Sequence, residues 1–132
     1  MSDIETTTVS EEGYASTSQV GDFELSIDAT GEKGPEPNQA LVADYASCYL
    51  PALRVAGQQL GYDDLGKIQI DADAELDGDD DLTSIEFAVY FEADVNGGDV
   101  EEIVSRAKDI CHVNSALRKG LRADIEGHSD AF

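Results

Sequence analysis

Basic residues are scarce in this 132-residue sequence: eight Lys and Arg stand against 29 Asp and Glu, and the net charge is −21. This balance excludes nucleic acid as a plain electrostatic partner, because affinity for phosphate requires Lys and Arg. An anionic membrane surface is disfavoured for the same reason. No apolar run is long enough to span a membrane, and residues 1–5 lack the basic and apolar regions of a signal peptide. We therefore expect a soluble, cytoplasmic protein.

The acidic excess also carries information about the solvent. With 41% hydrophobic residues the chain is expected to fold, so the charge belongs on its surface. Such a self-repelling surface destabilises a compact state in dilute buffer. In molar salt the screening length falls to about 3 Å and most of that cost disappears. The composition is similar to that of proteins from salt-accumulating halophiles; the alternative is an ordinary acidic protein.

Cysteine is equally scarce, with only Cys48 and Cys111. They are separated by 63 positions, so the close Cys pairs of a structural zinc site are absent and no metal is expected. The acidic turn at residues 77–81 does not match the Gly and Glu positions of an EF-hand loop. In a cytosolic chain two such thiols are either reactive or simply buried.

Alternating apolar and polar residues predict a single α+β domain over residues 1–132, with residues 1–11 and 127–132 frayed or peripheral. Asp99 is predicted to cap the second helix, with Glu102 three residues later. The predicted strands are residues 4–9, 14–20, 23–29, 67–76, 85–92 and 121–125. The predicted helices are residues 38–60 and 99–111, with a further turn within residues 113–119.

The helix predicted at residues 38–60 is apolar on nearly all sides, which is typical of a buried helix. Its roughly 33 Å length, at 1.5 Å per residue, equals the width of a small domain. One small sheet cannot cover every face of it, so a second chain is expected to help. Pro51 should kink the helix within one turn of Cys48, either opening space beside the thiol or simply curving the helix around a core.

Two short segments resemble the signatures of the OsmC/Ohr family. In that family a Gly-x-x-Pro-Glu stretch opens a central helix that carries the first Cys, and a Cys-Pro-x-Ser-type stretch follows a late helix. The matching residues here are Gly34-Pro35-Glu36-Pro37-Asn38-Gln39 leading to Asp44-Tyr45-Ala46-Ser47-Cys48, and Cys111-His112-Val113-Asn114-Ser115-Ala116-Leu117. The order of predicted elements also fits, so the resemblance extends over about residues 12–126.

The resemblance implies an OsmC-like fold, with antiparallel sheets wrapped around the long central helices of an intertwined homodimer. It also implies thiol-dependent reduction of hydroperoxides as a stress response, without a bound cofactor. Cys48 would attack the peroxide and become a sulfenic acid. Cys111 would condense with it to a disulfide, and an external dithiol reductant would restore both thiols.

The sequence departs from the family around the first thiol. Asn38 stands ten residues before Cys48, where the family has Glu, and no Arg occurs in residues 1–33. Glu36, Asn38 and His112 are the candidates for supporting the thiols in their place. Because a buried thiolate needs a cationic or donor partner, weakened peroxide reduction is expected. The alternatives are a non-catalytic ligand-binding or structural module on this fold, or a thiol redox sensor.

Overall fold

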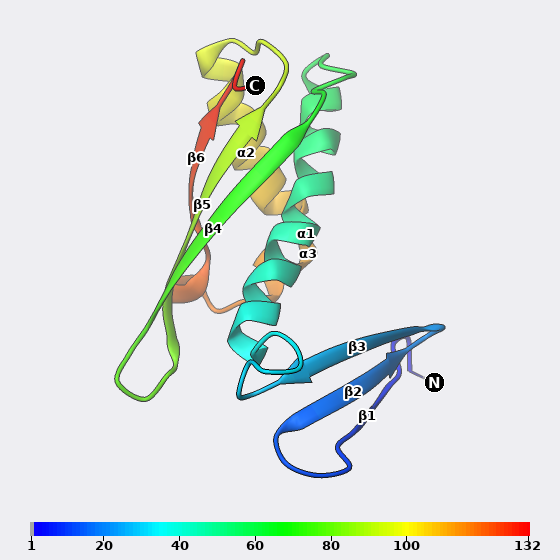
Figure 1. Ribbon diagram of the computed structural model, residues 1–132. Coiled ribbons are helices and arrows are strands. Elements are labelled where there is room, and N and C mark those ends of the chain that lie inside the picture. The colour runs from blue at the N-terminus through cyan, green and yellow to red at the C-terminus, as the bar shows by residue number, and fades with distance from the viewer. Residues whose placement is uncertain (1) are drawn as a thin grey trace. The chain divides into compact units, whose positions relative to one another are not determined.

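The computed structural model describes residues 2–132, which form two compact units that divide between Leu41 and Val42. The first unit contains a three-stranded antiparallel sheet in the order β1-β2-β3 (Figure 1). Its strands are Thr6–Val9, Ala15–Val20 and Phe23–Asp28. The N-terminal hairpin and the third strand predicted from the alternation are thus confirmed.

One face of β3 is apolar but uncovered. Phe23 and Leu25 point to the same side of the strand, as alternate residues do, and they are 75% and 53% exposed. The alternation thus correctly predicted a strand. Among residues 2–132, nothing covers the side chains of Phe23 and Leu25 on this face.

The loop after β3 is fixed by a buried carboxylate, that of Asp28. Its oxygens accept hydrogen bonds from the N–H and hydroxyl of Thr30 at 2.9 and 2.7 Å and from the N–H of Lys33 at 3.1 Å. Its own N–H donates to the carbonyl of Pro35 at 3.0 Å. Gly34 is required beside this loop, because a Cβ there would lie 2.6 Å from the carbonyl oxygen of Ser26. The loop therefore has a defined path into the following helix.

We expect the Asp28→Asn substitution to reduce the stability of the first unit at neutral pH and to flatten its acid unfolding. The bonds from Thr30 hold the pKa of Asp28 below its ordinary value of 3.8. A carboxyl with a lowered pKa stabilises the fold above its unfolded pKa and loses that contribution as the pH falls below it. Denaturant midpoints between pH 7 and pH 2 measure both effects. The exposed Asp22, changed to Asn, is the control, and an equal change in both variants would contradict the role of Asp28.

Helix α1, Pro37–Gln59, begins with a local cap and continues into the second unit. Pro37 occupies the first helical position, where its missing N–H costs nothing. Gln39 reaches back, and its Oε1 accepts a hydrogen bond from the N–H of Glu36 at 3.0 Å, which is half of a capping box. The predicted helix at residues 38–60 is confirmed to within one residue at each end.

Burial on α1 follows one stripe instead of the full circumference expected from its composition. The buried positions recur at helical spacing, and Leu41 and Val55, on other faces, are 36% and 42% exposed. The buried residues are Tyr45, Tyr49, Ala52, Leu53, Ala56 and Gly57. The expectation of a helix covered on every side is therefore not met within one chain.

The second unit contains a three-stranded sheet in the order β4-β5-β6, formed by Ile68–Leu76, Leu82–Phe91 and Asp124–His128. Strands β4 and β5 are antiparallel, whereas β6 runs parallel to β5. A parallel neighbour needs a crossover connection, and α2, Gly97–Ile110, lies within that connection. Glycine is needed where β6 meets this helix, since a Cβ on Gly127 would lie 2.7 Å from Val100 Cγ1.

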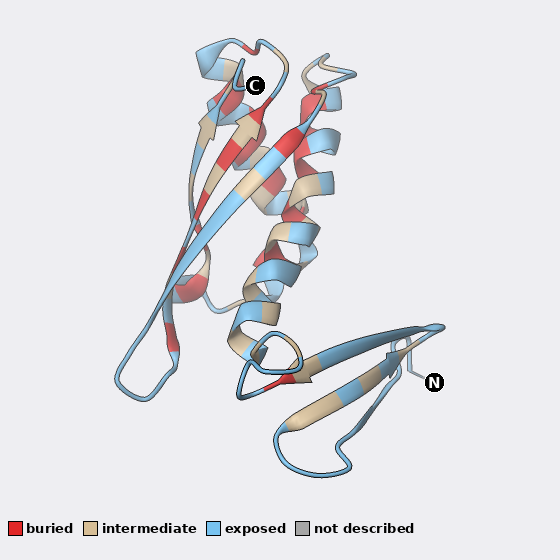
Figure 2. Cartoon of the chain, in the orientation of Figure 1, coloured by how far each residue is buried: buried red, intermediate tan, exposed pale blue. Residues whose placement is uncertain are grey.

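The hydrophobic core lies between the sheet of the second unit and its helices. Buried side chains concentrate on β5 and on the inner sides of α1 and α2 (Figure 2). The predicted inward face of β5 is confirmed: Ile85, Phe87, Val89 and Phe91 are all buried. Phe87 also contacts the rings of Tyr45 and Tyr49, with centroids 4.7 and 5.7 Å apart.

In the last third of the chain two local predictions are corrected, the N-cap of the helix and the start of the last strand, whereas the further helical turn is confirmed. Helix α2 is preceded by Asn96 as its N-cap, so Asp99 lies inside the helix and instead accepts a hydrogen bond from the Tyr62 hydroxyl at 2.6 Å. A short helix α3, His112–Ala116, follows, and Lys119–Leu121 forms the 3-10 turn η1. The last strand consequently starts at residue 124 instead of 121.

The C-terminal residues continue along the sheet. Residues 127 and 128 complete β6, and the N–H groups of Asp130 and Ala131 donate to the carbonyls of Ala93 and Phe91 at 3.0 Å each.

Within residues 2–132, no helix combines the length and the apolar character that crossing a membrane would require.

Candidate functional site

Cys48 lies on α1, between the two most buried aromatic residues of that helix. Tyr45 is three residues before it, so both side chains lie on neighbouring parts of one helix surface, and Tyr49 follows directly. Both tyrosines are completely buried, whereas Cys48 is half-buried. Cys48 packs against the edge of the core and keeps part of its surface accessible.

Cys111 lies at the junction between α2 and α3, where it ends one helix and caps the next. Its N–H donates to the carbonyl of Ala107 at 2.9 Å, as the last bond of α2. Its Sγ accepts a hydrogen bond from the N–H of Asn114 at 3.4 Å, in the position of an N-cap side chain of α3. The residue is 1% exposed, so this sulfur is held inside the protein by backbone geometry.

The structure brings the two thiols together as neighbours, and neither forms a disulfide. Burial has the largest effect on the Cys111 thiol and raises its pKa; the N–H of Asn114 opposes this and lowers it. The Cys48 side chain raises the pKa of Cys111 again, as a hydrogen-bonding and electrostatic neighbour. Cys111 is therefore held as a neutral thiol, while the backbone N–H groups of Asn114 and, to a smaller extent, Val113 favour its thiolate.

A ring of hydrogen bonds, two of them buried and two part-buried, lies beside the thiols and connects four segments. The Tyr45 hydroxyl donates to Asn114 Oδ1 and accepts from the N–H of Ala123 at 3.0 Å. Asn114 Nδ2 donates to the carbonyl of Lys108 at 3.1 Å, and Lys108 Nζ donates to the carbonyl of Ala123 at 3.1 Å. Burial raises the pKa of Tyr45, which keeps its hydroxyl protonated as a donor.

Comparison with protein families agrees with this arrangement. A family model described as OsmC-like protein matches residues 29–126 of the chain. The chain belongs to the OsmC-like family. The match covers the loop after β3, both cysteines and the first part of β6, so the resemblance identified from the two Cys segments is confirmed.

The chain is similar to a relative in sequence and to solved structures in fold. An uncharacterized protein of Haloferax volcanii is 63% identical over 132 residues, which is 100% of both chains; such a relative supports the halophile-like interpretation of the acidic composition. The OsmC-like protein from Mycoplasma pneumoniae is 17% identical with a TM-score of 0.80, covering 97% of this chain and 96% of that one. The organic hydroperoxide resistance protein OhrB of Bacillus subtilis is 21% identical with a TM-score of 0.71, covering 95% and 97%. The α+β, OsmC-like fold is thereby confirmed.

The three supporting residues suggested by sequence lie in different surroundings. His112 is the first residue of α3 and is exposed, although its neighbour Cys111 is buried. Glu36 and Asn38 flank the start of α1, in the first unit, where the N–H of Glu36 takes part in the helix cap. A role for these three residues toward the OsmC-like thiols stays a prediction.

Sequence reasoning missed two residues next to the thiols, Tyr45 and Asn114. Both lie within the quoted OsmC-like segments, three residues before Cys48 and three after Cys111. A signal was available, because a polar side chain at that helical spacing from an apolar-face thiol lies on the same side. What the sequence does not show is that the two meet across 69 positions.

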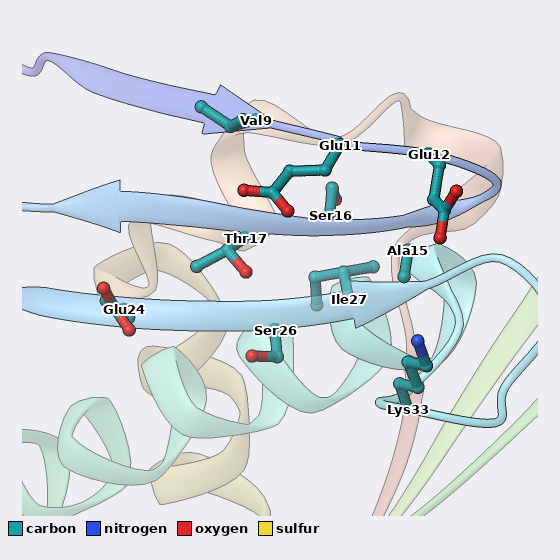
Figure 3. Close-up of a pocket in the computed structure, with 10 residues that line it drawn as sticks. All are labelled: Val9, Glu11, Glu12, Ala15, Ser16, Thr17, Glu24, Ser26, Ile27 and Lys33. Atoms are coloured by element: carbon teal, nitrogen blue, oxygen red, sulfur yellow. The ribbon is translucent and has the colours of Figure 1, made fainter.

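The first unit carries a separate hollow of about 560 Å³. Three carboxylates, those of Glu11, Glu12 and Glu24, lie around it together with Lys33 (Figure 3). All of its lining residues belong to the first unit, so it contains neither thiol. Acidic side chains around a polar hollow do not by themselves define a ligand. The reactive groups of this OsmC-like chain are its two cysteines.

Proposed function

We propose that this protein reduces hydroperoxides through a two-cysteine cycle, as part of a response to oxidative stress. The observation that carries the proposal is that Cys48 and Cys111, 63 positions apart, are neighbouring free thiols in the folded chain. Membership of the OsmC-like family supports it. So does the fold shared with the organic hydroperoxide resistance protein of Bacillus subtilis.

The difference in burial supports Cys48 as the thiol that attacks the peroxide and Cys111 as the thiol that resolves the intermediate. Cys48 is half-buried and able to meet a substrate, whereas Cys111 is 1% exposed. The Cys48 thiolate attacks the distal peroxide oxygen, the O–O bond breaks, and the alkoxide leaves as an alcohol after taking a proton. Cys48 is then a sulfenic acid.

Cys111 resolves that intermediate. Its sulfur loses its proton and attacks the sulfur of Cys48, the S–O bond breaks, and hydroxide leaves as water with the released proton. The product is a disulfide between the two cysteines. An external dithiol reductant then exchanges with this disulfide, restoring both thiols and becoming oxidised itself. The cycle needs no bound metal or cofactor.

We further propose that the working form is a homodimer. Apolar side chains are exposed on three elements of the single chain: β3, α1 and the C-terminal half of β4. The most exposed on each are Phe23 at 75%, Val55 at 42% and Leu76 at 48%. Exposed apolar patches mark interaction surfaces, and the family resemblance implies a second copy of this chain as the partner that would cover these side chains.

Treatment of the reduced protein with one equivalent of an organic hydroperoxide tests the cycle. We expect one equivalent of alcohol and one Cys48–Cys111 disulfide per chain, measured by mass spectrometry of non-reduced peptides. The Cys111→Ser variant, trapped with a sulfenic acid reagent, should be labelled at Cys48 alone. Oxidation first at Cys111, or a disulfide formed only between different dimers, would contradict the assigned roles. A disulfide that forms while added dithiol sustains no turnover would favour a redox sensor.

A further inference from the structure

We infer that Tyr45 and Asn114 are a positioning pair for the resolving thiol, holding the Asn114 N–H against Cys111 Sγ. The inference deepens the proposed function, on which its catalytic consequence rests. Neither residue touches a substrate in this scheme. They act through Cys111, by fixing the Asn114 N–H, the backbone donor with the larger effect on the Cys111 sulfur.

The geometry of Asn114 carries this inference, because three of its polar groups have different partners. Its N–H donates to Cys111 Sγ at 3.4 Å, its Oδ1 accepts from the Tyr45 hydroxyl, and its Nδ2 donates to the carbonyl of Lys108 at 3.1 Å. The side chain is therefore tied to α1 on one side and to the last turn of α2 on the other. With both ends fixed, the peptide N–H of Asn114 has a defined direction.

Tyr45 locks this arrangement from the opposite helix. Its hydroxyl is fully buried, donates to Asn114 and accepts from the N–H of Ala123 at 3.0 Å. A buried hydroxyl with both functions satisfied is costly to remove, because each partner is then left without a hydrogen bond. Loss of the hydroxyl frees Asn114 to turn, and the short helix α3 has only five residues to resist that movement.

The consequence for chemistry concerns the thiolate of Cys111, which is the form that attacks the sulfenic acid. A hydrogen bond to the charged form of a group favours that form, whereas burial disfavours it. The N–H groups of Asn114 and Val113 favour this thiolate. The titratable groups of α1 that interact with Cys111 are the Cys48 thiol and the hydroxyls of Tyr45 and Tyr49. Arg122 acts on Tyr45 from the segment before β6.

Tyr49 provides a matched control on the same helix. It is as buried as Tyr45, it also packs on Phe87, and its hydroxyl donates to the carbonyl of Val104 at 2.9 Å. The substitution Tyr49→Phe therefore removes one buried hydroxyl from the same core without breaking the ring of bonds around Asn114. A merely structural role predicts equal effects for the two tyrosines.

The experiment has two arms, each with Tyr45→Phe, Asn114→Ala and Tyr49→Phe. The first measures the pH dependence of Cys111 alkylation in a Cys48→Ser background by mass spectrometry, and needs no peroxide. We expect Tyr45→Phe and Asn114→Ala to shift the profile to higher pH by about one unit, equal to a tenfold change in thiolate fraction, and Tyr49→Phe to leave it in place. The double variant should shift it no further than either single one, because both break one network.

The second arm follows disulfide formation after a pulse of peroxide, with Cys48 present. Tyr45→Phe should slow this step about tenfold at neutral pH and leave the rate of Cys48 oxidation unchanged. Equal shifts for Tyr45→Phe and Tyr49→Phe, or none for Tyr45→Phe and Asn114→Ala, would overturn the inference. Should the first arm give the expected shift while peroxide leaves Cys48 unoxidised, the proposed function fails and the positioning role stands.

Discussion

Substitution of Cys48 by Ser is expected to reduce peroxide consumption to the uncatalysed background, whereas Cys111→Ser should consume one equivalent and stop. Serine keeps the size of the side chain, but its hydroxyl cannot be oxidised by a peroxide as a thiolate can. In Cys111→Ser the first step is intact, and Cys48 accumulates as a sulfenic acid because its resolving thiol is gone. The measurement is peroxide consumed per chain over many equivalents, with a dithiol reductant in excess.

A neighbouring hydroxyl supplies the control for this pair of variants. Ser47 precedes Cys48 on α1, is exposed, and donates only to the carbonyl of Ala43 within its own helix, at 2.8 Å. Ser47→Ala should therefore consume peroxide at the wild-type rate. Sustained turnover by Cys111→Ser would show that the dithiol reduces the sulfenic acid of Cys48 directly, and the two-cysteine cycle would then be wrong. Peroxide consumption by the Cys48→Ser variant would show that Cys111, and not Cys48, is the thiol that attacks the peroxide.

The parts of the site that sequence could predict are those encoded locally. Cys48 sits in a helix that its own apolar pattern defines, and its distance in sequence from the Gly34–Gln39 segment follows the family spacing. Cys111 follows a helix with a clear apolar stripe. Local patterns of this kind give element type and face, and the resemblance then gives the expectation that the two thiols meet.

The parts that sequence could not predict depend on long-range contacts. The Tyr45–Asn114 bond joins residues 69 positions apart, and nothing in either segment alone indicates its partner. The parallel pairing of β6 with β5 is likewise set by the crossover through α2 and not by the alternation of β6 itself. The cap of α2 was missed because Asp99 and Asn96 are both favourable cap residues, and Tyr62 engages Asp99 from outside the helix.

The exposed apolar faces have a different explanation. Composition and alternation predict that a residue such as Leu25 is suited to burial, but they do not say whether its own chain or a second copy covers it. The same uncertainty applied to α1, which was expected to be buried all round and is buried along one stripe in the single chain. These differences between prediction and structure are what a homodimer would resolve, so the state of assembly is an experimental question with a definite expected answer.

Dilution from molar KCl into low-salt buffer is expected to dissociate and unfold the protein. The chain has a net charge of −21, so its acidic side chains repel one another. This repulsion acts at longer range as the salt concentration falls, because the screening length grows from about 3 Å at 1 M to about 30 Å at 0.01 M. A dimer would carry twice that charge. As the salt concentration falls, the dimer should therefore dissociate before the chains unfold or at the same concentration. Sedimentation and circular dichroism across a KCl series measure both. A folded monomer persisting at low salt would contradict the homodimer and the halophile-like interpretation together.

A row of carboxylates across the second sheet gives this prediction a residue-level test. Asp73 on β4, Glu86 on β5 and Asp124 on β6 lie directly opposite one another in register, and like charges in opposing positions destabilise a sheet, each pair by roughly 0.2–1 kcal/mol. Glu86→Gln removes the central charge, so it should raise the denaturant midpoint at low salt, here the lowest KCl concentration at which the wild-type protein is still folded. It should have little effect in 2 M KCl, a concentration chosen to screen fully. Glu101→Gln is the matched control, because Glu101 is exposed near the N-terminus of α2, where a negative charge is favourable. It should give no gain at low salt. An equal gain from both variants would show that total charge, and not the opposing carboxylates of the sheet, determines the salt requirement.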